Sequence, residues 1–265
     1  MKSTRTTRLA SSSALVAVML LTLAGGATAA FNLVSLDQEW AMRDDMRRQV
    51  SSEMRVVNDQ RAVAYLNRIG REIAAQTPYG NRRWDFGIVE DNSLNAFNLP
   101  GGLVYVNTGL IREADTLDQL VGVLAHEIGH GASRHGTQLM TRAYGYNLLA
   151  GLALGRNPSM TQQVLANLVG TGVLNNYSRD AEHEADRLGV RYAYQAGYDP
   201  QGMVEFFETM LQERSRRPSK VEQFFSNHPL TEERLNRIAR EAQSLRRNSL
   251  TSDTRAYQQF RSQFR

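Results

Sequence analysis

The chain has 265 residues, with 31 Lys and Arg, 27 Asp and Glu, five His and no Cys. The lack of cysteine excludes a disulfide framework, a thiolate zinc site, a cysteine nucleophile and a cysteine-linked lipid anchor. The net charge of +4 invites a nucleic-acid partner, but residues 234–265 carry a net +6, and residues 1–29 contain three basic and no acidic side chains. Residues 30–233 are therefore mildly acidic, and we expect no nucleic-acid partner.

Residues 1–29 are predicted to be a signal peptide. A basic start precedes an apolar run over residues 14–23, which is about half of the roughly twenty residues that a membrane-spanning helix needs. Ala27 and Ala29 supply an A-x-A cleavage site. We expect export to the periplasm of a bacterial envelope, with an uncleaved N-terminal membrane anchor as the alternative. Residues 30–265 are then expected to form one domain that ends in a basic C-terminal tail.

The first half of this domain is predicted to hold a helical region and a small sheet. Residues 38–76 look helical, and their apolar positions form one buried stripe of Val56, Val63, Leu66, Ile69 and Ile73. Residues 84–89 alternate as a strand. Residues 95–99 and 103–106 are predicted to be two strands around a turn at Pro100-Gly101-Gly102.

The second half is predicted to be helical. A long helix is expected from Thr116 to about Arg142, followed by buried helices over residues 143–174. Two more helices are expected over 178–196 and 200–214. The charged C-terminal stretch is expected to be helical at first and frayed at its end. The fold class is therefore α+β, mostly helical with a small β-sheet.

The most informative motif is His126-Glu127-Ile128-Gly129-His130 in the long predicted helix. Residues four apart share one helix face, so both imidazoles can reach one metal ion. Glu127 lies about 100° round the helix, where it can contact a metal-bound water without binding the metal. A solvated face of His and Glu residues is the alternative interpretation of this motif taken alone.

A catalytic zinc also needs a third protein ligand and an open position for water. His135 would lie about 180° from His126 on a continuous helix, which makes it either a residue behind the ligands or a surface residue. The spacing of the metzincin class is absent. Further along the chain, Glu182 and Asp186 lie four residues apart on one predicted helix face. We expect Glu182 to bind the zinc and Asp186 to orient a ligating histidine.

Together these motifs resemble the HtpX-like, CAAX-prenyl-protease-type family of zinc metallopeptidases, which are gluzincins with HExxH and ExxAD motifs. The resemblance covers roughly residues 38–242 and is greatest to compact periplasmic members of the LoiP/BepA type. Other stretches that resemble the family are Asn95-Ala96-Phe97, residues 100–110, Ser178-Arg179 and Asn227-His228-Pro229-Leu230 with Arg234.

The resemblance implies a zincin-like domain with its sheet beside the active-site helix. It implies one zinc ion on His126, His130 and Glu182, with Glu127 as general base and acid. His228 and Arg234 are expected near the cleft, where the histidine of relatives can stabilise the oxyanion or approach the metal as a plug. An extended substrate is expected to add as a further strand along residues 95–99 or 103–107.

The expected function is zinc-dependent endopeptidase cleavage of misfolded or envelope proteins, by a water that Glu127 activates. The partners are then unfolded or extended polypeptides. The alternative is a latent or weakly active, chaperone-like quality-control protein that binds unfolded envelope polypeptides. A weaker alternative is peripheral contact of the Arg-rich end with anionic lipid through Arg237, Arg240, Arg246 and Arg247.

Overall fold

The computed structural model describes residues 32–153, 177–245 and 254–265. The predicted signal peptide, the 154–174 part of the predicted apolar helices, and Arg246 and Arg247 lie outside the described residues. The described helices are α1 (Leu36–Ala41), α2 (Arg43–Glu53), α3 (Gln60–Ala74), α4 (Thr108–Glu113), α5 (Leu117–Ala132), α6 (His135–Ala153), α8 (Arg179–Gln195), α9 (Gln201–Arg216), α10 (Pro218–Asn227), α11 (Glu232–Ser244) and α12 (Thr254–Ser262). The α+β class is confirmed.

A three-stranded sheet lies beside these helices, with β3 (Leu103–Asn107) at its centre. The strand β1 (Asp85–Val89) pairs with β3 in parallel, and β2 (Ala96–Leu99) pairs with it in the antiparallel sense. Gly101 and Gly102 have φ angles of 86° and 72°, which allow the tight turn between β2 and β3. The three predicted strands are confirmed, and β2 rather than β3 is an edge of the sheet.

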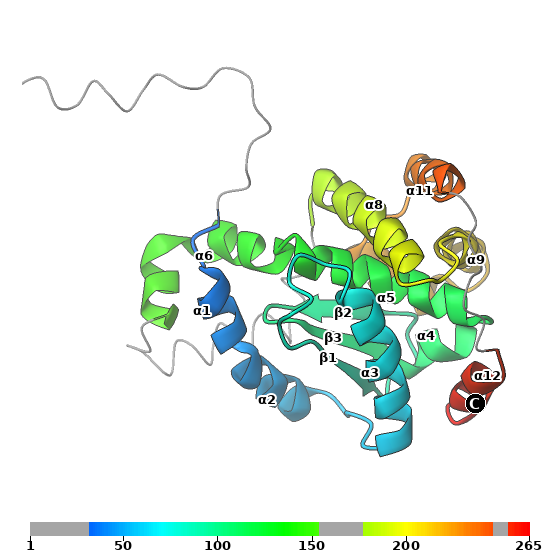
Figure 1. Ribbon diagram of the computed structural model, residues 1–265, viewed down its shortest axis with the longest axis horizontal. Coiled ribbons are helices and arrows are strands. Elements are labelled where there is room, and N and C mark those ends of the chain that lie inside the picture. Colours follow the sequence, from blue (N-terminus) through cyan, green and yellow to red (C-terminus); the bar gives the residue numbers. More distant parts are fainter. Residues whose placement is uncertain (1–31, 154–176, 246–253) are drawn as a thin grey trace, which may run out of the picture. The chain divides into compact units, whose positions relative to one another are not determined.

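Helices cover both faces of the sheet (Figure 1). On one face, α3 and α5 pack against apolar side chains such as Phe86, Val104 and Val106. On the other face, Met46 and Val50 of α2 and Met140 of α6 pack against strand residues such as Val89, Leu99, Leu103 and Tyr105. The sheet is therefore buried on both faces. At the β1 edge, Phe86 bonds to the side chain of Asn67, and the backbone oxygen of Ile88 accepts from the N–H of Val57.

The helix α5 is the centre of the fold, because it lies between the sheet and the helices α8 and α9 (Figure 1). Its contact with α8 is close. A Cβ atom at Gly129 would lie 2.6 Å from the backbone oxygen of Ala185, and one at Gly189 would lie 2.9 Å from the backbone of Ala125. These two glycines bring the backbones of α5 and α8 near enough for side chains of both helices to meet at one point.

The predicted helix over residues 38–76 is wrong as a continuous element. The structure divides it into α1, α2 and α3, and Met54 is already extended. Val56 forms an isolated bridge with Val89 at the sheet edge, so its place in the predicted helical stripe was also wrong. The side chain of Asp59 caps the next helix by accepting from the backbone N–H groups of Arg61 and Ala62. Pairing with the sheet therefore overrides the helical pattern of this segment.

The predicted long helix from Thr116 to Arg142 is also two helices. Thr116 caps its start by accepting from the backbone N–H of Gln119, but α5 ends at Ala132. Arg134 takes a positive φ of 58°, which breaks the helix before α6 begins at His135. The chain kinks again at Gly145, whose φ is 67°. The break at Arg134 changes the direction in which His135 points.

The end of the chain is packed rather than frayed. The helix α12 buries Tyr257 and Phe260 in the main core. The Tyr257 hydroxyl donates to the backbone oxygen of Ala114, at 2.6 Å, and Arg261 donates to the backbone oxygen of Arg112. Among the described helices, none is both long and apolar enough to cross a membrane.

Candidate active site

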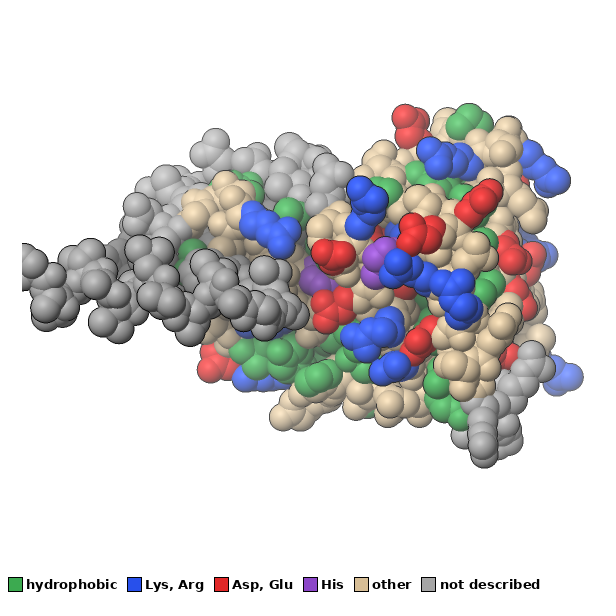
Figure 2. Space-filling view, turned by 90° about the horizontal axis from the view of Figure 1, so that it is seen from above, with side chains coloured by type: hydrophobic (Ala, Val, Ile, Leu, Met, Phe, Trp, Pro, Cys, Tyr) green, Lys and Arg blue, Asp and Glu red, His purple; other side chains and the backbone are tan. Residues whose placement is uncertain are grey.

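The helix α5 places His126, Glu127 and His130 in the interior, and none of the three has any exposed surface. The two imidazoles lie one helical turn apart, and their Nε2 atoms are 3.1 Å from each other. The apolar face of the same helix, which includes Val121, Leu124 and others, packs into the core and fixes the direction of this pair. On the face of the molecule drawn in Figure 2, histidine side chains (purple) occupy only a small part of the surface.

The helix α8 brings a carboxylate to the same point. Ser178 caps its N-terminus by accepting from the backbone N–H of Ala181, and Glu182 follows on the first turn. The Oε1 atom of Glu182 lies 3.4 Å from Nε2 of His130, and its Oε2 atom lies 3.6 Å from Nε2 of His126.

His228, at the end of α10, completes the cluster. Its Nδ1 atom lies 3.2 Å from Nε2 of His126 and 3.1 Å from Oε1 of Glu182. One ligand atom from each of His126, His130, Glu182 and His228 falls within 4.8 Å of the others. The Nε2 atom of His228 also lies 3.4 Å from Oε1 of Glu127. His228 therefore stands between the general-base candidate and the three predicted ligands.

These spacings fit a zinc ion. Ligands about 2.0–2.1 Å from a tetrahedral zinc are roughly 3.3 Å apart, which is close to the nitrogen–nitrogen and nitrogen–oxygen distances of this cluster. The Nε2 atoms of the two imidazoles face each other at 3.1 Å, and when both carry a lone pair a shared metal ion satisfies them. Among the described residues, neither carboxylate oxygen of Glu127 forms a hydrogen bond of good geometry. The donor set of nitrogen and oxygen atoms suits zinc.

A buried ion-pair network lies behind the ligands. Oδ1 of Asp186 is 2.9 Å from Nδ1 of His126. Arg234 holds Asp186 through two hydrogen bonds of 2.8 Å, and another of its nitrogens lies 2.8 Å from Oε2 of Glu182. It also donates to the backbone oxygen of Pro229. Arg234 is thus directed at the carboxylates from behind, and it is only 2% exposed.

His135 is buried beside His130 rather than on the far side of the helix. Because α5 ends at Ala132, His135 turns back, and its Nδ1 atom lies 2.9 Å from Nδ1 of His130. Its Nε2 atom is 3.4 Å from Oε2 of Glu184 on α8. The prediction that put His135 opposite His126 was wrong because it assumed a continuous helix. The sequence left His135 either behind the ligands or on the surface, and the structure places it behind the ligands.

Sequence reasoning missed Tyr177. Its ring stacks on His130, with centroids 4.0 Å apart and an interplanar angle of 22°. Its hydroxyl is buried, and no hydrogen-bond partner is found for it in the described part of the chain. The only signal was its position immediately before the Ser178 helix cap, and a tyrosine there is also consistent with ordinary core packing.

The cluster sets the charge states of its members. Burial raises the pKa of Glu127, although His228 and His126 oppose this effect. Burial also acts to raise the pKa of Glu182, but His228 and His130 outweigh it, so the pKa lies well below its ordinary value. Burial lowers the pKa of His130 well below the usual range. An anionic Glu182 beside a neutral His130 matches what a divalent ion requires of its ligands.

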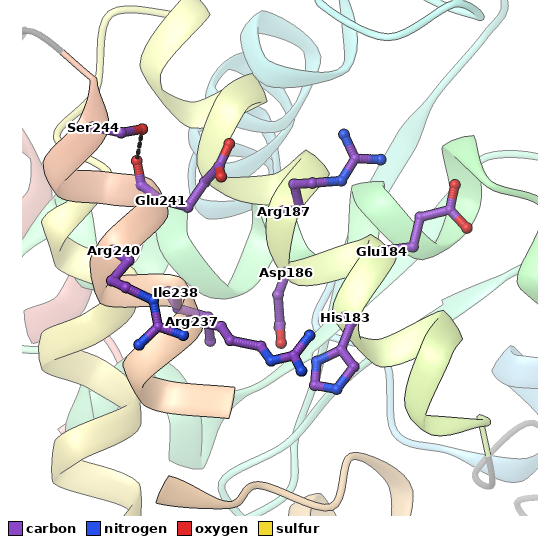
Figure 3. Close-up of a pocket in the computed structure, with 9 residues that line it drawn as sticks. All are labelled: His183, Glu184, Asp186, Arg187, Arg237, Ile238, Arg240, Glu241 and Ser244. Atoms are coloured by element: carbon purple, nitrogen blue, oxygen red, sulfur yellow. Dashed lines mark hydrogen bonds between the residues drawn. The ribbon is translucent and has the colours of Figure 1, made fainter. Parts of the chain in front are cut away.

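A surface cavity of about 600 Å³ lies between α8 and α11. Figure 3 shows Arg237 reaching from α11 across this cavity toward His183 and Asp186 of α8. Asp186 therefore faces both the cavity and, through His126, the cluster. Both basic and acidic side chains line the cavity. The lining residues are His183, Glu184, Asp186, Arg187, Arg237, Ile238, Arg240, Glu241 and Ser244.

Comparisons with known proteins agree with this site. Residues 60–242 match peptidase family M48. The chain is 30% identical over 231 residues to the beta-barrel assembly-enhancing protease of Escherichia coli strain K12, an alignment that covers 81% of this chain and 46% of that protein. It is 31% identical over 211 residues to the mitochondrial metalloendopeptidase OMA1 of Schizosaccharomyces pombe, covering 78% of this chain and 62% of that protein.

A third relative is the beta-barrel assembly-enhancing protease of Yersinia pestis, 31% identical over 218 residues, covering 78% of this chain and 44% of that protein. The chain thus spans about half the length of the curated bacterial relatives it matches. The family match includes the elements α3 to α11, and with them every residue of the buried cluster. The chain belongs to peptidase family M48.

Proposed function

We propose that this protein is a zinc-dependent metalloendopeptidase that cleaves unfolded or extended polypeptides. The observation that carries the proposal is the convergence of His126, His130 and Glu182 next to Glu127, whose buried carboxylate has no well-formed hydrogen bond in the described structure. Hydrolysis needs such a carboxylate beside the metal, because a water must lose a proton there. The match to a peptidase family supports the same conclusion.

His126, His130 and Glu182 would hold the zinc ion, and Asp186 would orient His126. A bound ion would supply Lewis acidity to the substrate carbonyl and to the attacking water. Glu127 takes the proton of the attacking water and passes it to the leaving amine. The raised pKa of Glu127 suits this double role, since it brings the carboxyl group nearer to neutral pH.

Substrate binding is proposed along β2. This strand is an edge of the sheet, and in the described part of the chain no other strand pairs with its outer side, where an extended peptide can add. In the ladder with β3, the backbone N–H of Asn107 donates to the oxygen of Asn95, which leaves the groups of Ala96 and Asn98 directed outward. The backbone of Asn98 acts to lower the pKa of the Glu127 carboxyl group, so the two groups are close. A peptide paired with this edge would therefore lie next to Glu127.

His228 is proposed to act as a plug in the resting arrangement. It fills the fourth position of the cluster and approaches Glu127, at the place where a water has to enter. An oxyanion role would require it to move away from Glu182 by rotation or by displacement of the α10–α11 connection. Arg234, by contrast, is proposed to support the ligands, because its guanidinium donates to Asp186, Glu182 and the backbone of Pro229 in the described structure.

We further propose that residues 1–29 are a signal peptide, that residues 30–265 form the peptidase domain, and that the protein acts in the periplasm on misfolded or envelope proteins. The basic start, the short apolar run and the A-x-A site of the leader support export. Similarity to proteins named beta-barrel assembly-enhancing proteases supports an envelope substrate. The alternative of a chaperone-like binder is less favoured, because the relatives are named as proteases.

The test compares the wild type with Glu127→Gln on casein, an unfolded substrate. The variant should keep one zinc ion per chain and lose cleavage, since the amide cannot take a proton from water. The matched control is Glu208→Gln, which changes an exposed carboxylate on α9 and should leave both quantities unchanged. Cleavage by Glu127→Gln at the wild-type rate would falsify the assigned base, and a wild type without zinc would refute the metal site.

A further inference from the structure

Four guanidinium groups converge on the carboxylate of Asp85, at the start of β1. They come from Arg43 and Arg47 of α2, Arg71 of α3 and Arg83 of the preceding loop, and we call these four residues the arginine cluster. A nitrogen of Arg71 lies 2.8 Å from Oδ1, and nitrogens of Arg83 and Arg47 lie 3.0 and 3.7 Å from Oδ2. Arg43 contacts Oδ2 directly.

The cluster holds more positive charge than its carboxylates neutralise. In the described part of the chain, the one other carboxylate that pairs with the cluster is Asp44, which lies 2.7 Å from Arg47. Four cations against two anions leave a local charge of +2, although residues 30–233 as a whole are acidic. Burial lowers the pKa of Arg43, and the charges of Arg83 and Arg47 lower it further against the opposing effect of Asp85. The like charges therefore repel one another.

The four arginines divide into one structural and three exposed members. Arg43 is buried, and it donates to the backbone oxygens of Arg83 and Gly101, at 2.7 and 2.8 Å, so it ties α2 to the sheet. The side chains of Arg47, Arg71 and Arg83 are 43%, 57% and 62% exposed. Their outer donors face solvent, where another ligand can reach them.

A cavity of about 410 Å³ adjoins two of the exposed members, Arg71 and Arg83. It is lined by Arg71, Ala74, Gly80, Arg82, Arg83 and Trp84, so three guanidinium side chains border it and no carboxylate does. Arg82 adds a cation whose only ion-pair partner among the described residues is Asp37, with a side chain that is 83% exposed. Such an exposed ion pair contributes little free energy, so another anion can replace Asp37 as the partner of Arg82.

We propose that the arginine cluster and the adjoining cavity bind a phosphate group. Guanidinium groups donate in a fork that matches phosphate oxygens, and a phosphate offers more acceptor oxygens than a carboxylate. A phosphate with two negative charges would cancel the excess of +2, and one with a single charge would halve it, without displacing Asp85. The phosphate can belong to an anionic lipid headgroup or to a soluble molecule. The site is remote in sequence from the metal ligands, and the inference does not depend on the proposed function.

The test uses the full chain with two probes: vesicles of phosphatidylglycerol and phosphatidylcholine, and inorganic pyrophosphate. Wild type should co-sediment with the anionic vesicles or show a higher melting temperature with pyrophosphate, and either effect should weaken with salt. R47Q/R71Q/R83Q should lose about fivefold in affinity per arginine, or roughly 100-fold in total. R55Q/R142Q/R216Q removes the same charge from exposed positions to which no binding role is assigned, and should bind like wild type.

A second variant separates binding from folding, because Arg71 also donates to the backbone oxygen of Trp84. R47Q/R83Q keeps that bond and should lose roughly 25-fold. Vesicle binding identifies a lipid headgroup as the source of the phosphate, and pyrophosphate binding alone identifies a soluble molecule. The proposal is overturned if wild type binds neither probe, if the cluster variants bind like wild type, or if the control variant loses binding equally.

Discussion

Replacing His135 by Phe should loosen the zinc without unfolding the protein. The ring of Phe fills the same space next to Tyr177 and His130 but cannot hydrogen-bond. Because Nε2 of His130 faces the cluster, its Nδ1 carries the proton and donates to Nδ1 of His135, at 2.9 Å. His135 in turn presents its other nitrogen to Glu184. The substitution therefore leaves a fully buried N–H donor without a partner.

The magnitude follows from that burial. An unsatisfied buried donor costs about 1–3 kcal/mol, which corresponds to roughly 5–150-fold in a binding constant. Loss of a group that orients a metal-binding histidine typically weakens metal affinity by about 10–100-fold. We expect a zinc dissociation constant about 10–100 times that of the wild type, measured by competition with a chromogenic chelator.

Two further variants make the assay specific. His135→Asn places an amide oxygen near the position of Nδ1 and should recover most of the affinity. His183→Asn changes a partly exposed histidine of α8 that does not contact the cluster, and should leave zinc binding as it is. The reasoning is refuted if His135→Phe binds zinc as tightly as the wild type, or if the melting temperature of the metal-free protein falls while affinity is unchanged.

Three other substitutions or treatments probe the same site. His228→Ala should keep zinc on three ligands and cleave casein faster than the wild type, because it opens the fourth position; equal or slower cleavage would contradict the plug. Arg234→Leu leaves Asp186 and Glu182 buried without their cation and should cost about 3–5 kcal/mol of unfolding free energy, measured with urea on metal-free protein; a loss below about 1 kcal/mol would contradict the network. Removing zinc with a chelator should lower the free energy of unfolding by about 4 kcal/mol relative to protein at a free zinc concentration 1,000 times the dissociation constant, and an unchanged thermal transition would show that the ion does not bind the folded state.

The sequence was sufficient for the parts of the structure that local patterns determine. The alternation over residues 84–89 and the Pro-Gly-Gly turn predicted the strands, and the four-residue spacing of His126 and His130 predicted their shared direction. The spacing of Glu182 and Asp186 placed both on the inner face of α8, as the structure has them.

Long-range contacts determine the rest, and periodicity does not record them. Val56 is apolar at a helical position, yet a bridge to Val89 makes it extended. The left-handed conformation of Arg134 is unusual for an arginine, and it carries a hydrogen bond to Glu39 of α1, 95 residues away. Tyr257 looked like part of a charged tail, but its hydroxyl finds an acceptor 143 residues away. The surroundings of His135 depend on the turn at Arg134, so the sequence pattern could not predict them either.

The dispersed origin of the buried cluster has a consequence for biosynthesis. His126 and His228 lie 102 residues apart, and Glu182 comes from a third segment between them. A chain that is still being made, or that is only partly folded, cannot assemble the set, because the ligands meet only after α8 has docked on α5 and the end of α10 has arrived. The proposed peptidase activity is therefore absent from nascent and partly folded chains.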